Sequence, residues 1–174
     1  MRKNLIVWGL TGAILVPAAF ANKPVTPTDP TAERVRHQLA MLPYYNVFDD
    51  LSFRVNDGVV TLYGEVTNPV FKDDAARAVK HIEGVQRVDN QIEVLPLSPF
   101  DNRIRRAMFG AIYGYGPLQR YGWGPVPAIH IIVKDGHVTL EGVVSSEQDK
   151  QLAYLRANGV PSVFSVRNNL RVQS

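Results

Sequence analysis

Apolar and polar residues alternate on both sides of an Asp-Gly pair at two places in the chain. Period two is the spacing of a half-buried β-strand. A tight primed turn between two strands requires positive φ at both central residues, and Asp-Gly is one of the pairs that tolerate it. The pattern predicts two β-hairpins, over residues 51–66 and 129–144, with turns at Asp57, Gly58, Asp135 and Gly136.

The two hairpins belong to a longer internal repeat. Residues 56–66 return in similar form as residues 134–144, at an offset of 78 residues (136 minus 58). Residues 88–94 and 166–172 keep the same offset. Two matches at one spacing indicate a duplication, so we expect two copies of one small unit.

An amphipathic helix is expected before and after each hairpin. In the first copy, Val35 and Leu39 recur at helical spacing before the hairpin, while Asn68 can cap a helix after it. The second copy offers comparable helices around Ile104 and around Leu155. The expected fold class is α+β, with two tandem α-β-β-α-β units. Each unit would pack two helices on a three-stranded mixed sheet.

The first 21 residues have the pattern of a secretory signal peptide. Arg2 and Lys3 precede an apolar run that is too short to span a bilayer, and a small-residue cleavage pattern ends at Ala21. We expect a periplasmic or secreted protein, cleaved near Ala21. The remaining expected boundaries are an extended tether at 22–28, a first domain at 29–95, a proline-rich linker at 96–100 and a second domain at 101–174.

The distribution of charge separates the two copies. The chain has no cysteine, which excludes thiolate metal sites and cysteine nucleophiles. Residues 29–95 contain 7 Lys and Arg against 11 Asp and Glu, whereas residues 101–174 contain 9 against 5. An anionic partner would therefore favour the second copy. The total charge of +3 includes Arg2 and Lys3 of the expected signal, so it does not indicate nucleic-acid binding.

Glycine and asparagine recur at matching positions of the two copies. Gly64 and Gly142 stand where the alternation requires an inward side chain, and we expect that a side chain there would collide with the overlying helix or disturb a bend. Asn90 and Asn168 interrupt the apolar row of the last strand. They could bind a ligand, or they could satisfy backbone groups at a strand start or turn.

The second copy carries an insertion. Aligning Val35 with Ile104 gives an offset of 69, nine less than the strand offset (78 minus 69), so about nine residues are added near 113–125. The added stretch is rich in aromatic residues and glycine, and arginines lie within and before it. Aromatic rings with one polar end suit lipid headgroups and arginines suit phosphate, although the rings could instead pack on their own core. The candidate membrane or partner contacts are Arg105, Arg106, Tyr113, Tyr115, Arg120, Tyr121 and Trp123.

The sequence shows no arrangement typical of a catalytic or metal site. The adjacent carboxylates at 49–50 precede a strand, and those at 73–74 lie near a helix start, where the helix dipole explains them. No nucleophile, base and orienting group come together in a known motif. We expect no enzyme, cofactor or metal. The histidines lack ligand spacing, and we expect all four to face solvent: His37, His81, His130 and His137.

The segments 57–66 and 83–90, with their second copies, resemble the BON domain (bacterial OsmY and nodulation). Two copies of this domain together would cover most of the chain after residue 21. One departure is Ser162, which stands where the first copy has Gly84. The resemblance implies a non-enzymatic envelope module, often duplicated in periplasmic osmotic-stress proteins and associated with phospholipid binding. In similar two-domain proteins, the second copy is the one proposed to contact anionic lipid.

Three functional hypotheses follow from the sequence. The first is peripheral binding of an anionic phospholipid membrane surface through the second copy. The second is binding of envelope proteins, with no role for lipid. The third is a carbohydrate or peptidoglycan binder that depends on Trp123. We expect no nucleic-acid partner and no metal partner.

Overall fold

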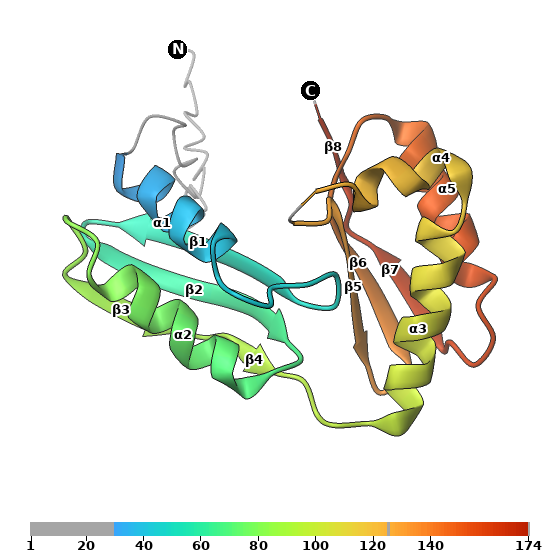
Figure 1. Cartoon of the computed structure of the whole chain (residues 1–174), viewed down its shortest axis with the longest axis horizontal. Coiled ribbons are helices and arrows are strands. Elements are labelled where there is room, and N and C mark those ends of the chain that lie inside the picture. Colours follow the sequence, from blue (N-terminus) through green and yellow to red (C-terminus); the bar gives the residue numbers. More distant parts are fainter. Residues whose placement is uncertain (1–29, 125, 174) are drawn as a thin grey trace, which may run out of the picture.

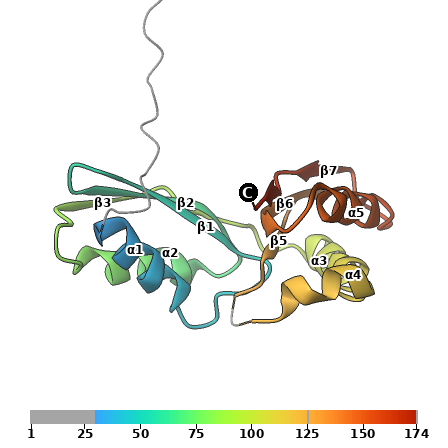
Figure 2. The ribbon, with the colours of Figure 1, turned by 90° about the horizontal axis from the view of Figure 1, so that it is seen from above.

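The computed structural model describes residues 30–124 and 126–173, which form two similar α+β units in tandem (Figure 1). In each unit the helices cover one face of a mixed β-sheet (Figure 2). The predicted fold class is confirmed. The expected signal peptide at 1–21 and tether at 22–28 lie outside the described residues. Within the two described ranges, no helix has the length and hydrophobicity needed to cross a bilayer.

The first unit has the predicted order of elements, with a break in its last strand. β1 and β2 form the antiparallel hairpin, and β3 and β4 each pair in parallel with β2. The asparagine predicted to cap the second helix does so, because the Asn68 side chain accepts a hydrogen bond from the amide of Val70. The elements are α1 Pro30–Ala40, β1 Asp50–Asn56, β2 Val59–Val66, α2 Pro69–Lys80, β3 Arg87–Asn90 and β4 Glu93–Val94.

The break in the last strand coincides with the repeated asparagine. Asn90 donates from its side-chain amide to the carbonyl of Lys72 at 2.6 Å and accepts from the amide of Ile92 at 3.2 Å. Asn168 makes the equivalent two contacts in the second unit, at 2.9 and 3.3 Å. Both side chains therefore tie the strand to the preceding helix and bridge a local turn, which is the backbone-satisfying role.

The second unit repeats the same plan with a longer first section. The inserted residues lengthen the first helix from 11 residues in α1 to 15 in α3, and they add α4 and η1. Ser98 caps α3, so the proline-rich linker ends earlier than expected. The elements are α3 Pro99–Tyr113, α4 Gly116–Gln119, η1 Arg120–Gly122, β5 Ile129–Lys134, β6 His137–Val144, α5 Glu147–Asn158, β7 Ser165–Asn168 and β8 Arg171–Val172.

The two hairpin turns have the predicted geometry. Asp57 and Gly58 have φ values of 47° and 78°, and Asp135 and Gly136 have 51° and 78°. In the second unit the buried carboxylate of Asp101 accepts hydrogen bonds from the amides of Asp135 at 3.1 Å and Gly136 at 2.8 Å. The first turn of α3 thereby fixes the tip of the hairpin.

The two strand glycines are required by the neighbouring strand. Gly64 has a φ of +119°, and a Cβ there would lie 2.1 Å from the carbonyl oxygen of Asp50. Gly142 has a φ of +118°, and its Cβ would lie 2.1 Å from the carbonyl oxygen of Ala128. The prediction of a collision with the overlying helix is wrong, because the obstacle in both units is backbone at the start of the first strand.

One loop of the first unit completes the core of the second. Val47 is 6% exposed and lies in the second unit's apolar core, and its carbonyl accepts the Ile131 amide at 2.7 Å. Tyr45 stacks on His130 with ring centroids 5.4 Å apart. Because this loop covers β5, His130 is buried, and the prediction that it faces solvent is wrong.

Candidate interaction surface

The structure divides the seven predicted contact residues into three groups by exposure. Buried side chains cannot meet a membrane or a partner without unfolding the unit that holds them. The buried side chains are Arg105, Tyr113 and Tyr121, at 5%, 7% and 7% exposure. Tyr115 is half-buried, and the exposed residues are Arg106, Arg120 and Trp123.

Arg105 and Tyr113 hold α3 against the outer strand of the second sheet. A guanidinium nitrogen of Arg105 donates to the carbonyl of Val133 at 2.7 Å, and the hydroxyl of Tyr113 donates to the carbonyl of Ile129. Burial lowers the pKa of Arg105 and raises the pKa of the Tyr113 phenol. The prediction that these two side chains contact a partner is corrected, because both are used inside the unit.

Tyr121 and Arg120 clamp the insertion to the start of α5. The carboxylate of Asp149 accepts from Arg120 at 2.8 Å, from the Tyr121 hydroxyl at 2.9 Å and from the Ser146 hydroxyl at 2.6 Å. Burial alone would raise the pKa of Asp149, but these hydrogen bonds and the Arg120 charge outweigh it, so the pKa lies below its usual range. Tyr121 is thus a structural residue, and Arg120 is committed to an ion pair.

Some of the exposed basic and apolar side chains of the second unit lie on α3 and α5, which pack on each other. Arg106 is exposed on α3, and Leu155 on α5 is 66% exposed. Arg156 lies over the ring of Tyr115 at 4.9 Å and donates to the carbonyl of Ala111. A surface hollow of about 260 Å³ lies between the two helices. It is lined by Ala107, Ala111, Leu155, Arg156, Gly159, Val160 and Pro161.

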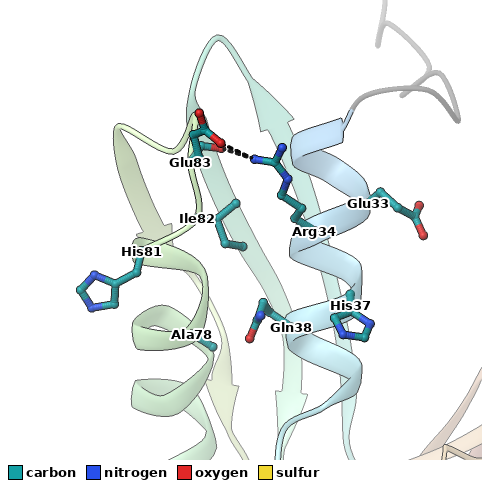
Figure 3. A pocket seen from close by; sticks show the side chains of 8 residues that line it. All are labelled: Glu33, Arg34, His37, Gln38, Ala78, His81, Ile82 and Glu83. Atoms are coloured by element: carbon teal, nitrogen blue, oxygen red, sulfur yellow. Dashed lines mark hydrogen bonds and ion pairs between the residues drawn. The ribbon is translucent and has the colours of Figure 1, made fainter.

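The first unit has a hollow at the corresponding place, between α1 and α2, with a different lining. It measures about 560 Å³ and is lined by Glu33, Arg34, His37, Gln38, Ala78, His81, Ile82 and Glu83. Figure 3 shows Arg34 reaching toward Glu83, with which it forms an ion pair at 3.2 Å. His37 and His81 lie on opposite sides of this hollow and point away from each other (Figure 3). In the part of the chain that the structure describes, no cluster of His, Cys, Asp or Glu could hold a metal.

The repeat offsets allow the two hollows to be compared position by position. With the helix offset of 69, His37 corresponds to Arg106. With the strand offset of 78, Ala78 corresponds to Arg156. The acidic Glu83 corresponds by the same offset to Pro161. The hollow of the second unit is lined by one cation, Arg156, and by no carboxylate, and Arg106 lies outside its lining. The hollow of the first unit is lined by Arg34, two histidines and two glutamates.

Leu155 and Arg156 are part of this surface that sequence reasoning missed. Leucine at residue 155 suggests the packed side of its helix, yet its side chain is mostly exposed while Ala153 and Ala157 are fully buried. The internal repeat could have revealed the exposure of Leu155, since Leu155 corresponds to the charged Arg77 at the offset of 78. A charged residue at the equivalent position of the first copy favours a solvent-facing position for Leu155.

The chain belongs to the BON domain family, since the family pattern matches residues 28–96 and 118–174. The protein therefore has two BON domains in tandem, one in each structural unit. It is 25% identical to Osmotically-inducible protein Y of Escherichia coli (strain K12), over 99% of this chain and 96% of that protein. The second family match begins within α4, so it includes neither α3 nor the start of the insertion.

Two solved structures of CdsD, a structural protein of the Type III secretion system of Chlamydia trachomatis, were also matched. One contains its C-terminal domain, is 12% identical and covers 82% of this chain and 96% of that chain, with a TM-score of 0.34. The other is also 12% identical and covers 81% and 91%, with a TM-score of 0.33.

Proposed function

We propose that this protein is a non-enzymatic component of the bacterial cell envelope that binds anionic phospholipid surfaces through its second BON domain. We place it in the periplasm and in the response to osmotic stress. Membership of the BON family and similarity along nearly the whole chain to an osmotically inducible protein support this role. The expected signal sequence at residues 1–21 supports the location.

The observation that carries the proposal is the surface where α3 packs on α5. Arg106 is exposed on α3 and Arg156 is exposed on α5, and Leu155, which lines the hollow between the two helices, is mostly exposed. A basic side chain near an anionic leaflet contributes about 1 kcal/mol, and the attraction fades beyond a Debye length of roughly 8–10 Å. An apolar side chain beside such cations can enter the headgroup boundary. The surface therefore suits reversible, salt-sensitive contact with a bilayer.

Flotation with liposomes tests the proposal. The chain from residue 22 to 174 is mixed with neutral or anionic vesicles at low and at high salt. We expect the protein to float only with anionic vesicles, and less of it at high salt, because the contact is electrostatic. Absence of flotation under every condition would remove lipid binding as the function.

An envelope protein partner is the second candidate function. Trp123 favours it, since its side chain is 76% exposed and it lies within the insertion that Asp149 clamps in place. A rigidly held exposed aromatic ring is typical of protein-binding surfaces. Under this function the liposome experiment gives no flotation, so the two candidates lead to opposite outcomes.

A further inference from the structure

Both units place their first strand at the outer edge of the sheet, which Figure 1 shows for β1 and β5. The residues that flank a two-residue hairpin turn exchange hydrogen bonds with each other, so alternate residues of each strand point their N–H and C=O groups outward. Lys134 flanks the turn in β5, and Asn56 flanks it in β1. The outward groups therefore belong to residues 129, 131 and 133 in β5, and to residues 51, 53 and 55 in β1.

The outer edge of β5 is covered at all three positions. Tyr113 donates to the carbonyl of Ile129, and Arg105 donates to the carbonyl of Val133. Between them, the amide of Ile131 donates to a carbonyl from the loop of the first unit. The side chains of these three β5 residues are 0% exposed. An edge blocked in this way cannot pair with another strand.

The outer edge of β1 lacks this cover. The amide of Leu51 donates to the hydroxyl of Tyr45 at 3.2 Å. Within residues 30–124 and 126–173, no hydrogen bond reaches the outward groups of Phe53 or Val55. The apolar side chains of these strand residues are only half-buried, although they occupy the same row as the fully buried residues of β5. An open edge beside a partly exposed apolar row is a template for strand pairing.

The residues that could cover β1 are present but turned elsewhere. At the helix offset of 69, Arg105 corresponds to Arg36 and Tyr113 corresponds to Tyr44. Arg36 instead forms an ion pair with Glu33 on its own helix. Tyr44 is 85% exposed. The two units thus have the same pair of side chains at equivalent positions, and only the second unit uses them to close its edge.

We propose that β1 pairs with β1 of a second copy of this chain, in antiparallel register about Phe53, and that a two-fold dimer with a continuous sheet results. In this register Phe53 lies opposite Phe53 of the second copy, where the outward groups of both face each other. The same register sets Ser52 opposite Arg54, so no like charges lie directly opposite. The apolar row of β1 would then continue across the dimer axis, which is the self-complementarity that a two-fold interface requires.

The dimer is independent of lipid binding, because β1 lies in the first unit and the proposed membrane surface lies in the second. A single strand pair buries less than the roughly 1,200 Å² of a stable interface. We therefore expect a weak dimer that dissociates on dilution. The dimer would contain two copies of the second unit.

Analytical ultracentrifugation of residues 22–174 without lipid tests the proposal over a wide concentration range. Ser52→Lys places a cation opposite Arg54 and should weaken dimerisation, whereas Ser52→Glu places an anion there and should strengthen it. A directly opposed charge pair changes the dissociation constant by about threefold or more in each direction. Residue 52 is exposed, so neither variant should affect folding.

A second pair of variants tests the backbone edge itself. Val55→Pro removes an outward N–H without removing a hydrogen bond to β2, and proline is tolerated on an edge strand for this reason. It should abolish the dimer, while Val55→Ala, which keeps the N–H, should retain most of it. A protein that stays monomeric at every concentration overturns the proposal. It would do so even if a different polypeptide pairs with the β1 edge, because the proposal is that β1 pairs with itself. Equal effects of Ser52→Lys and Ser52→Glu overturn the register and with it the proposal.

Discussion

The strand glycines illustrate how a single position can be decided by backbone alone. Gly142 has a left-handed φ and a neighbouring carbonyl oxygen at the place where a Cβ would lie. Any L-residue there must move the start of β5 or strain its own backbone. Because β5 carries the contact between the two units, the disturbance would reach beyond the second unit.

We expect Gly142→Ala to lower the free energy of unfolding by about 2 kcal/mol or more, since φ strain and the backbone clash act together. Gly110→Ala is the matched control, because Gly110 lies in α3 with no atom within 4 Å of its added Cβ. That change should stabilise the helix by about 0.5–1 kcal/mol. Urea unfolding of both variants measures the two effects, and an equal effect of the same sign would contradict this account.

The structural role of a residue was predictable where that role depends only on the neighbouring residues in the sequence. The Asp-Gly turns, the cap at Asn68 and the alternation of β2 follow from local backbone rules, and the structure has them. The roles of Arg105 and Tyr113 were not predictable in this way. Their partners lie 28 and 16 residues away in β5, and only the fold brings these groups together.

At the scale of elements, the repeat predicted the order of helices and strands, and the insertion explains the largest departure. Aromatic and glycine-rich composition left two alternatives, a partner-binding segment or rings packed on their own core, and the segment forms the end of α3, α4 and η1. Composition does not show whether a ring has a buried partner. The decisive group is Asp149, which is 29 residues from Arg120 and was invisible to any local pattern.

The clamp at Asp149 makes its own prediction. Tyr121→Phe removes the donor to the Asp149 carboxylate and the acceptor of the Ser145 amide, which lies at 2.9 Å. Arg120 also donates to this hydroxyl, and loss of a buried hydroxyl with three partners should cost about 1–3 kcal/mol of unfolding free energy. Tyr115→Phe is the control, since the ring of Tyr115 packs under Arg156 and that contact needs no hydroxyl. Thermal unfolding of the two variants should separate them, and equal melting temperatures would show that the clamp contributes little.

At the scale of the whole molecule, carboxylates collect where the two units meet. Asp50 lies opposite Glu65 in the β1–β2 register, and Glu65 lies opposite Glu93 on β4. Burial, then the charge of Glu141 in the second unit, raises the pKa of Asp50 to about 6, although Arg171 opposes the shift. Burial and the nearby carboxylates also raise the pKa of Glu65. Ionisation of Asp50 and Glu65 therefore weakens the contact between the units, whereas Glu93 of the first unit forms an ion pair with Lys134 of the second.

The sign of the pH dependence follows from this shift. A carboxyl that binds its proton more tightly when folded adds stability at low pH, and that stability is lost as pH rises through about 6. Asp50→Asn should therefore raise the melting temperature at pH 7.5, with a gain that shrinks below pH 6. Buried His130 has a lowered pKa and opposes stability in acid, so the difference between variant and parent is the quantity to measure.

Asp57→Asn is the matched control for Asp50→Asn. It removes the same charge from an exposed turn position, and Asn-Gly suits this turn as well as Asp-Gly does. Its melting temperature should follow that of the parent at each pH. A pH-independent effect of Asp50→Asn would show that the carboxylates between the units are not coupled to stability.

The proposed membrane function rests on a difference between two copies of one fold, and that difference supplies the most direct test. Arg106 on α3 corresponds to His37 on α1 at the offset of 69. In flotation with anionic vesicles at low salt, Arg106→Glu should remove most of the binding, whereas His37→Glu should leave it unchanged. Equal binding by both variants and the parent protein would contradict the assignment of the membrane contact to the second unit.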